Sequence, residues 1–207
     1  MEKEFFEFIK DRQFIWYKRF ILKQQSPWTK DRVLRTYKIL NIYRELDKGT
    51  KYIIEELKHV NNREIILLNI IFYRFFNRYN LFENLGIKIL DRIDEKELIE
   101  RFSILRKKGI PIFSDAYLIA SNEKGQEKHI TIIRNLAKLD IKAIVKNIDA
   151  SKKPEQSLKA IQEIQTVGPF LAYEIWTDLT YFNFFKQKWT DNDFVNIGPG
   201  AKWGLEI

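Results

Sequence analysis

The chain has 207 residues, 45% of them hydrophobic and 31% charged, and its net charge at pH 7 is +8. This composition fits one domain with a real core, and the basic balance favours a polyanionic partner, although charge also serves solubility. The absence of cysteine excludes disulfides, thiol catalysis, cysteine-bound zinc and iron–sulfur clusters. His59 and His129 stand apart with no ligand spacing around them, so we expect no metal site.

The N-terminus does not resemble a signal peptide, because residues 1–12 form an amphipathic pattern with charges of both signs. The longest apolar run, residues 65–73, is interrupted by Asn69 and is too short to span a bilayer. We therefore expect a cytoplasmic protein without membrane association.

Hydrophobic residues recur at helical spacing along nearly the whole chain, so the predicted fold class is all-α. The helix over residues 63–79, capped by Asn61 and Asn62, is apolar almost all round and is expected to be central and buried. We expect an N-terminal lobe of about residues 1–120 and a hairpin lobe of about residues 128–207. The other expected helices cover residues 4–24, 30–46, 50–59, 94–108, 128–148 (as one helix or two), 157–165 and 169–181.

A tight turn, Thr166-Val167-Gly168, separates the last two expected helices, and Pro169 begins the second. Main-chain N–H groups at a helix start form a ready phosphate site, so these three turn residues are candidate contacts to a DNA backbone. Additional phosphate neutralisation is expected from three basic residues nearby, Lys186, Lys188 and Lys202. The alternative is an ordinary corner between two helices with solvated lysines.

The segment from Gln165 to Ile175 resembles the hairpin of helix-hairpin-helix DNA glycosylases, which implies a glycosylase-like bundle of two helical lobes. Members of that family place a catalytic Asp downstream of the hairpin, and the matching acid here is Asp193, with Asp191 in reserve. A carboxylate near the sugar can stabilise an oxocarbenium-like transition state or activate water. Alternatively, Asp191 caps a turn and Asp193 pairs with a lysine.

A second resemblance covers more of the chain. Five segments in order are similar to the helical family of hydroxymethyluracil DNA kinases and alpha-glutamyl/putrescinyl thymine pyrophosphorylases. This resemblance implies a connection with hypermodified DNA bases. The segments are Pro27–Asp31, Asn41–Asp47, Phe72–Arg78, Gly168–Phe170 and Gly198–Ala201.

A flipped base needs flat surfaces to stack on and polar groups that read its edge. Aromatic residues with a polar atom are suited to the first task, and polar residues on two helices to the second. The alternative for the charged members is an internal ion-pair network with Asp47. The candidate base pocket contains Trp28, Asn41, Tyr43, Arg44, Arg74, Asn77, Tyr117 and Tyr173.

The expected function is that of a monofunctional DNA glycosylase. It would flip a hydroxymethylated or glycosylated pyrimidine out of double-stranded phage DNA and leave an abasic site, without a cofactor and as part of phage defence. One alternative is an enzyme or helical accessory domain that modifies hydroxymethyluracil-type DNA. The other is a DNA-binding module without catalysis. The sequence contains no G-x-x-x-x-G-K-[ST] motif, so we do not expect kinase activity from this chain.

Overall fold

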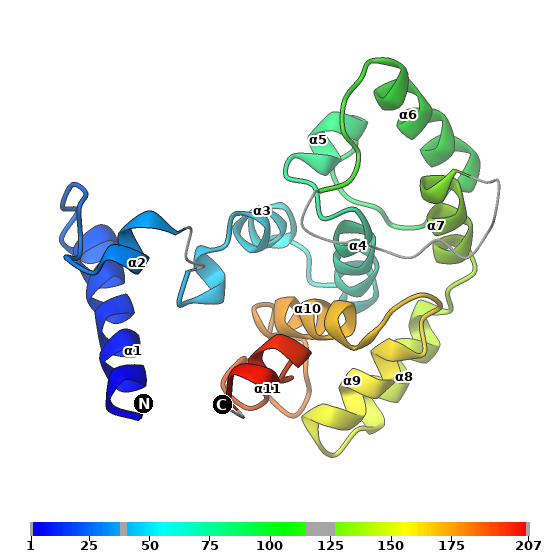
Figure 1. Ribbon diagram of the computed structural model, residues 1–207. Helices are drawn as coiled ribbons and strands as arrows, with labels where there is room; N and C mark the ends of the chain where they lie inside the picture. Colours follow the sequence, from blue (N-terminus) through cyan, green and yellow to red (C-terminus); the bar gives the residue numbers. More distant parts are fainter. Residues whose placement is uncertain (1, 38–40, 115–126, 206–207) are drawn as a thin grey trace. The chain divides into compact units, whose positions relative to one another are not determined.

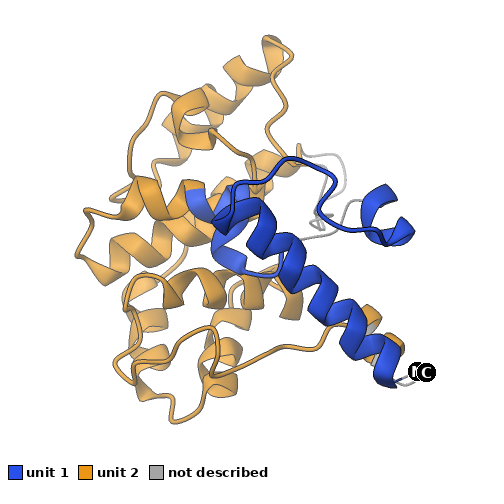
Figure 2. Cartoon of the chain, turned by 90° about the vertical axis from the view of Figure 1, so that its left-hand side faces the viewer, with its two compact units in different colours: residues 1–51 blue, residues 52–207 orange. Residues whose placement is uncertain are grey.

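The computed structural model describes residues 2–37, 41–114 and 127–205. Within these ranges the chain is built from helices joined by loops, without a strand, which confirms the all-α prediction (Figure 1). The chain forms two compact units, Met1–Lys51 (unit 1) and Tyr52–Ile207 (unit 2), coloured separately in Figure 2. No helix in the described ranges is long and apolar enough to cross a membrane.

Unit 1 begins with the predicted N-terminal helix. It is present as α1 (Glu2–Trp16), continued by the π-helical turn η1 (Tyr17–Ile21). The single helix predicted over residues 30–46 is wrong. Only the short α2 (Arg32–Thr36) and a 3-10 turn, η2 (Arg44–Leu46), are helical among the described residues of that range. The chain becomes extended at Tyr37 (ψ 145°), where Thr36 and Tyr37 both have modest helix propensity.

The central helix of unit 2 is α4 (Arg63–Phe76), in which every residue from Ile66 to Phe76 is buried. Asn62 caps it by accepting hydrogen bonds from the N–H groups of Glu64 (2.8 Å) and Ile65 (3.2 Å). The helix packs against α8 and α10. Its predicted cap and central position are therefore confirmed. It ends three residues before the predicted end because Asn77 takes a left-handed conformation (φ 47°).

Other helices of unit 2 pack against their neighbours in the sequence. α6 contacts both α5 and α7, and α9 contacts both α8 and α10. Residues 128–148 form two helices rather than one, because Asp140 caps the second through the N–H of Ala143 (3.0 Å). The bounds are α3 (Lys48–Leu57), α5 (Leu81–Leu85), α6 (Glu95–Lys107), α7 (Lys128–Ala137), α8 (Ile141–Ala150), α9 (Pro154–Gln162), α10 (Pro169–Thr180) and α11 (Pro199–Leu205).

The two compact units differ from the two lobes expected from the sequence. The boundary lies after Lys51, far before the expected division near residue 120. The physical reason is that α4 shares one core with α8 and α10, so the middle of the chain belongs with the hairpin helices.

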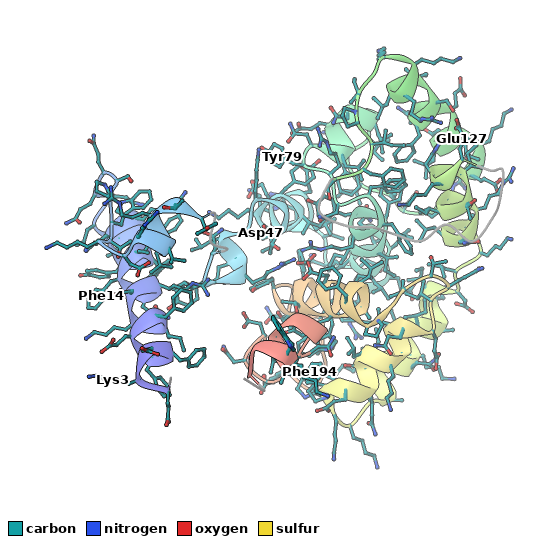
Figure 3. The ribbon with its side chains drawn as sticks, viewed as in Figure 1. Lys3, Phe14, Asp47, Tyr79, Glu127 and Phe194 are labelled. Atoms are coloured by element: carbon teal, nitrogen blue, oxygen red, sulfur yellow. The ribbon has the colours of Figure 1, made fainter. Side chains whose placement is uncertain are left out.

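The loop after α10 folds back onto that helix through aromatic side chains. The Trp176 ring is buried, and its Nε1–H donates to Ser157 Oγ on α9 at 2.8 Å. Phe194 is labelled in Figure 3. Its ring lies 5.7 Å from the Trp176 ring and 5.9 Å from that of Tyr173 in edge-to-face arrangements. This cluster fixes the path of the chain between α10 and α11.

Candidate nucleic-acid interface

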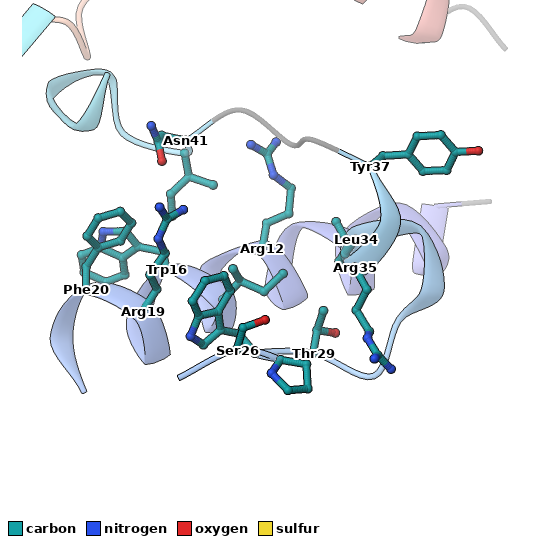
Figure 4. Close-up of a pocket in the computed structure, with 14 residues that line it drawn as sticks. Arg12, Trp16, Arg19, Phe20, Ser26, Thr29, Leu34, Arg35, Tyr37 and Asn41 are labelled. Atoms are coloured by element: carbon teal, nitrogen blue, oxygen red, sulfur yellow. The ribbon is translucent and has the colours of Figure 1, made fainter. Parts of the chain in front are cut away.

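A cavity of about 450 Å³ lies within unit 1 (Figure 4). We call it the unit 1 pocket. One wall is a single face of the helix formed by α1 and η1. The other walls are the loop before α2, α2 itself and the segment that leads to η2. Its lining consists of Arg12, Ile15, Trp16, Arg19, Phe20, Ser26, Pro27, Trp28, Thr29, Leu34, Arg35, Tyr37, Asn41 and Ile42.

The helical face of this pocket follows directly from residue spacing. Its five members, at positions i, i+3, i+4, i+7 and i+8, lie on one side of a helix. Arg12 and Arg19 stand two turns apart with Trp16 between them. Figure 4 shows both guanidinium groups extending toward the segment that carries Asn41. The Arg35 side chain points away from that segment in the same view.

Aromatic rings hold Arg19 in position. Its guanidinium carbon lies 4.9 Å from the centroid of the Phe20 ring and 5.2 Å from that of Trp28. Such cation–π contacts orient the planar guanidinium while leaving its N–H donors in the ring plane available for hydrogen bonds. Arg19 remains exposed, so this group is oriented before any ligand arrives.

One hydrogen bond attaches the loop that carries Trp28 to the preceding helix, and a second lies within the loop. Lys18 Nζ donates to the carbonyl oxygen of Trp28 (2.8 Å), and the Trp28 indole N–H donates to the carbonyl oxygen of Gln24 (2.8 Å). Asp31 then caps α2 by accepting from the Leu34 N–H at 2.7 Å. The pocket wall is therefore held by specific contacts as well as by packing.

The charge of the pocket is one-sided. Arg12, Arg19 and Arg35 line it, and none of its described lining residues carries a carboxylate. A site with several guanidinium groups and aromatic rings suits an anionic, planar ligand. Among the described residues, no group of three or more His, Asp or Glu side chains could hold a metal ion.

The predicted hairpin is present in unit 2, between α9 and α10. Thr166 takes a left-handed conformation (φ 68°), whereas Gly168 is extended (φ −81°, ψ 175°) and exposed. The Val167 side chain is buried, and its N–H donates to the carbonyl oxygen of Ile164 at 3.0 Å. The Val167 N–H, which was predicted to contact a DNA phosphate, is therefore already hydrogen-bonded within the turn.

The three candidate lysines have different surroundings. Lys186 pairs with Asp149 at 2.7 Å, and Asp149 also binds Arg63 through both carboxylate oxygens. The Arg63 and Lys186 contacts hold the pKa of Asp149 below its ordinary value, against a smaller opposing effect of burial. Lys188 is exposed in a left-handed turn (φ 60°), and Lys202 is exposed on α11. Lys186 therefore shares its charge with a carboxylate.

Asp193 and Asp191 form structural contacts within the loop after α10. Asp193 accepts from the N–H of Thr190 (2.7 Å) and from its hydroxyl (2.8 Å), and these bonds lower the pKa of Asp193. The Tyr181 hydroxyl donates to Asp191 at 3.0 Å. Both carboxylates thus stabilise a turn, close to the alternative considered from the sequence.

The structure distributes the expected base-pocket residues over both units. Trp28 and Asn41 line the unit 1 pocket. Tyr43 contacts the Trp16 ring at 4.9 Å, and Arg44 begins η2. In unit 2, Tyr173 belongs to the Trp176 cluster. Tyr117 lies outside the described residues.

Arg74 and Asn77 are part of a buried network in unit 2. Arg74 binds Asp178 on α10 through two parallel bonds and lies 3.2 Å from Glu174, while Asn77 Oδ1 accepts from Arg74 Nη1 at 3.1 Å. The alternative expected from the sequence was an internal ion-pair network with Asp47. Asp47 instead caps α3 through the N–H groups of Gly49 and Thr50.

Sequence reasoning missed the helical face of the unit 1 pocket. Arg12, Trp16 and Arg19 lie in a stretch whose apolar residues predicted only an amphipathic helix. The available signal was the pair of arginines seven residues apart with an aromatic residue between them, which places all three on one face.

Comparison with known proteins identifies the family of the chain. The family model described as "5-hmdU DNA kinase, helical domain" matches residues 1–207. The chain is also 30% identical over 222 residues to a 5-hmdU DNA kinase of Bacillus phage SP10. That alignment covers 95% of this chain and 34% of the relative, so the chain spans about a third of the relative's length. No solved structure matches.

These findings correct the expected enzyme class. The relative is a kinase, a phosphoryl-transfer enzyme, and not a hydrolase that removes bases. The prediction of a monofunctional glycosylase with Asp193 or Asp191 as its acid is therefore wrong, and the bonds of both carboxylates to Thr190 and Tyr181 give them a structural role. The second resemblance noted in the sequence is confirmed. The chain belongs to the family of 5-hmdU DNA kinase helical domains.

Proposed function

We propose that the chain is the DNA-recognition domain of an enzyme system that phosphorylates hydroxymethyluracil in DNA. The match of the whole chain to the kinase helical-domain family supports this function most directly. The name of the phage relative supplies the substrate class, 5-hydroxymethyldeoxyuridine in DNA. This corresponds to the second of the three functions considered from the sequence.

In this proposal the phosphoryl-transfer site lies in another part of the system. The sequence has no phosphate-binding loop of the G-x-x-x-x-G-K-[ST] type. About two thirds of the kinase relative has no counterpart in this chain and offers ample length for a catalytic domain. The helical domain would bind the modified DNA and present its hydroxymethyl group.

Two surfaces support DNA as the ligand. The unit 1 pocket combines three arginines with aromatic rings. In unit 2, the α9–α10 hairpin exposes Gly168, with Lys188 and Lys202 also exposed. We propose that the hairpin contacts the DNA backbone in the manner of helix-hairpin-helix proteins, with Thr166 and Gly168 as its main-chain donors. The net charge of +8 favours both contacts.

Binding of labelled duplexes tests this function directly. Two duplexes should differ only in one base, thymine or 5-hydroxymethyluracil, and affinity is read by fluorescence anisotropy. We expect tighter binding of the modified duplex by about twofold to tenfold, the worth of one additional hydrogen bond. Equal affinity for both duplexes, or no binding to either, contradicts the proposed recognition.

The same duplexes test the absence of a phosphoryl-transfer site. With radiolabelled ATP and Mg²⁺, the chain alone should transfer no label to the hydroxymethyl duplex. Transfer by the chain alone would contradict the division of labour proposed here.

A further inference from the structure

We propose that the unit 1 pocket binds one nucleotide that lies outside the base stack, with its ring against the aromatic wall and a phosphate group on Arg12 and Arg19. The inference rests on the proposed function, because it assigns a place and a chemistry to recognition of the modified nucleotide. It also adds an anionic group to that recognition, which a hydroxymethyl base by itself does not require.

The lining of the unit 1 pocket is rich in positively charged side chains. A neutral hydroxymethyl pyrimidine needs only a few neutral donors and acceptors. Arg12, Arg19 and Arg35 all line the pocket, and none of its other described lining residues carries a carboxylate. Guanidinium groups bind phosphate through paired, charge-assisted hydrogen bonds. The arginine-rich lining therefore points to a phosphate-bearing ligand.

The helical face of the pocket places two arginines close to an aromatic residue. Arg12 precedes Trp16 and Arg19 follows it on the same helical face, and both guanidinium groups extend toward the segment of Asn41 (Figure 4). In the same view the Trp16 ring lies beside that of Phe20. Arg19 is already oriented by the rings of Phe20 and Trp28. A flat ring against Trp16 would thus share the pocket with two guanidinium groups. The Asn41 amide donates one N–H to the carbonyl oxygen of Leu46 at 3.2 Å, and its Oδ1 and second N–H can read the edge of a pyrimidine.

The volume of the pocket suits a single nucleotide. About 450 Å³ falls within the range of about 300–1,000 Å³ that is usual for small-ligand sites. A base paired inside a duplex cannot reach a concave site, so the occupant must be extruded or single-stranded. Aromatic walls favour such a base because stacking is available on the face of any ring.

The phosphate can come from two sources with the same chemistry. One is the DNA backbone next to the extruded nucleotide, which carries a single charge per phosphate. The other is a phosphate on the hydroxymethyl oxygen of the base, the product class of the phage relative's reaction. A phosphomonoester carries nearly two charges at pH 7 and three acceptor oxygens, so three arginines favour it further.

Binding of three single-stranded oligonucleotides distinguishes these cases. They should be identical except for one central base, which is thymine, 5-hydroxymethyluracil or 5-phosphomethyluracil. Arg12→Gln and Arg19→Gln are the test variants. Arg32→Gln is the matched control, because Arg32 is an exposed arginine of the same unit that does not line the pocket. Circular dichroism and thermal unfolding establish that each variant is folded.

We expect each test variant to weaken binding of the phosphomethyl oligonucleotide by about tenfold, the effect of one lost charged hydrogen bond, while Arg32→Gln changes it little. A smaller loss on the hydroxymethyl oligonucleotide assigns the phosphate to the base. Equal losses on all three oligonucleotides assign it to the backbone. Both results support binding of the nucleotide in the unit 1 pocket.

A second pair of variants tests the stacking wall. Trp16→Leu should weaken binding about fivefold or more, whereas Trp16→Phe, which keeps a flat ring, should recover most of the affinity. If all pocket variants bind like the wild type while the wild type still prefers modified duplexes, the pocket assignment is overturned and the proposed function survives. If the wild type shows no preference for modified DNA, the proposed function itself fails.

Discussion

Arg74 is almost fully buried in unit 2, with an exposed fraction of 1%. Its partner Asp178 on α10 is fully buried and meets it in a parallel, two-bond geometry of 2.6 and 2.7 Å. Burial of charge is costly unless both ions are paired and hydrogen-bonded. The pair therefore joins α4 to α10 and fixes their register.

Replacing Asp178 with Asn tests this pairing. The variant keeps the shape of the side chain but leaves the Arg74 guanidinium with less compensation inside the core. We expect a loss of about 3–5 kcal/mol in the free energy of unfolding, measured by urea denaturation. Asp91→Asn, at an exposed carboxylate of the same unit, should change it by less than about 0.5 kcal/mol. A similarly small effect of Asp178→Asn would mean that the pair does not hold the two helices.

At the scale of elements, α4 is specified by local sequence at both ends. Asn62 satisfies two N–H groups of its first turn, and Asn77 ends it in a left-handed conformation that Asn tolerates better than most residues. Between these ends the helix is apolar on every side, so it can only be stable when surrounded by other helices. The same local rules failed for residues 30–46, where Asp31 caps α2 but the chain becomes extended at Tyr37, after two residues of modest helix propensity.

The adjacent asparagines before α4 offer a matched comparison of capping. Asn62→Ala removes the acceptor for the Glu64 and Ile65 N–H groups, and we expect it to destabilise the protein by about 1 kcal/mol. Asn61→Ala, at an exposed position one residue earlier, should leave stability nearly unchanged. Chemical denaturation measures the free energy of unfolding of the two variants. Equal effects would contradict the assignment of the cap to Asn62.

At the scale of the whole molecule, the net charge of +8 favours the DNA binding proposed above. Each phosphate that a cationic side chain neutralises releases counterions, so affinity falls linearly on logarithmic axes as salt rises. Contacts from the arginines of unit 1 and the lysines of unit 2 to about two to four phosphates predict a slope of about −2 to −4. A titration between low and high NaCl measures it, and a slope near zero would exclude backbone contacts.

The pH dependence of stability is a second property of the whole molecule. His129 is buried against the Phe102 ring, and burial lowers its pKa below the ordinary 6.5, opposed in part by Glu127 and reinforced by Arg106. The unfolded chain therefore binds more protons than the folded one as pH falls below about 6.5. Stability should be constant above that pH and should decrease below it, down to the folded-state pKa.

Thermal unfolding between pH 8 and pH 5 checks this expectation. His129→Phe keeps a ring beside Phe102 and removes the titrating group, so its loss of stability at low pH should be smaller than that of the wild type. The control is His59→Gln, because His59 is exposed. Identical pH profiles for His129→Phe and the wild type would show that another group causes the loss.

Sequence by itself determined the properties that depend on short-range patterns. Helical spacing gave the all-α class, Asn62 gave the start of α4, and ordered segments such as Asn41–Asp47 and Phe72–Arg78 gave the resemblance to the modified-base family, which the comparisons confirm. The expectation of a glycosylase failed because it depended on the hairpin and one downstream acid. Asp193 accepts bonds from Thr190, and no pattern of residue types distinguishes such a turn from a catalytic carboxylate.

Only the tertiary structure decided which distant residues meet. Arg74 pairs with Asp178, 104 positions later, and Arg12 lines one cavity with Trp28 and Asn41. Periodicity places a side chain on a face of its own helix but does not say which element covers that face, because the packing depends on the shapes and charges of all the helices together. For this reason the polar residues of α4, which were predicted to line a base pocket, lie buried in the core, whereas the arginines of α1 and η1 line the unit 1 pocket.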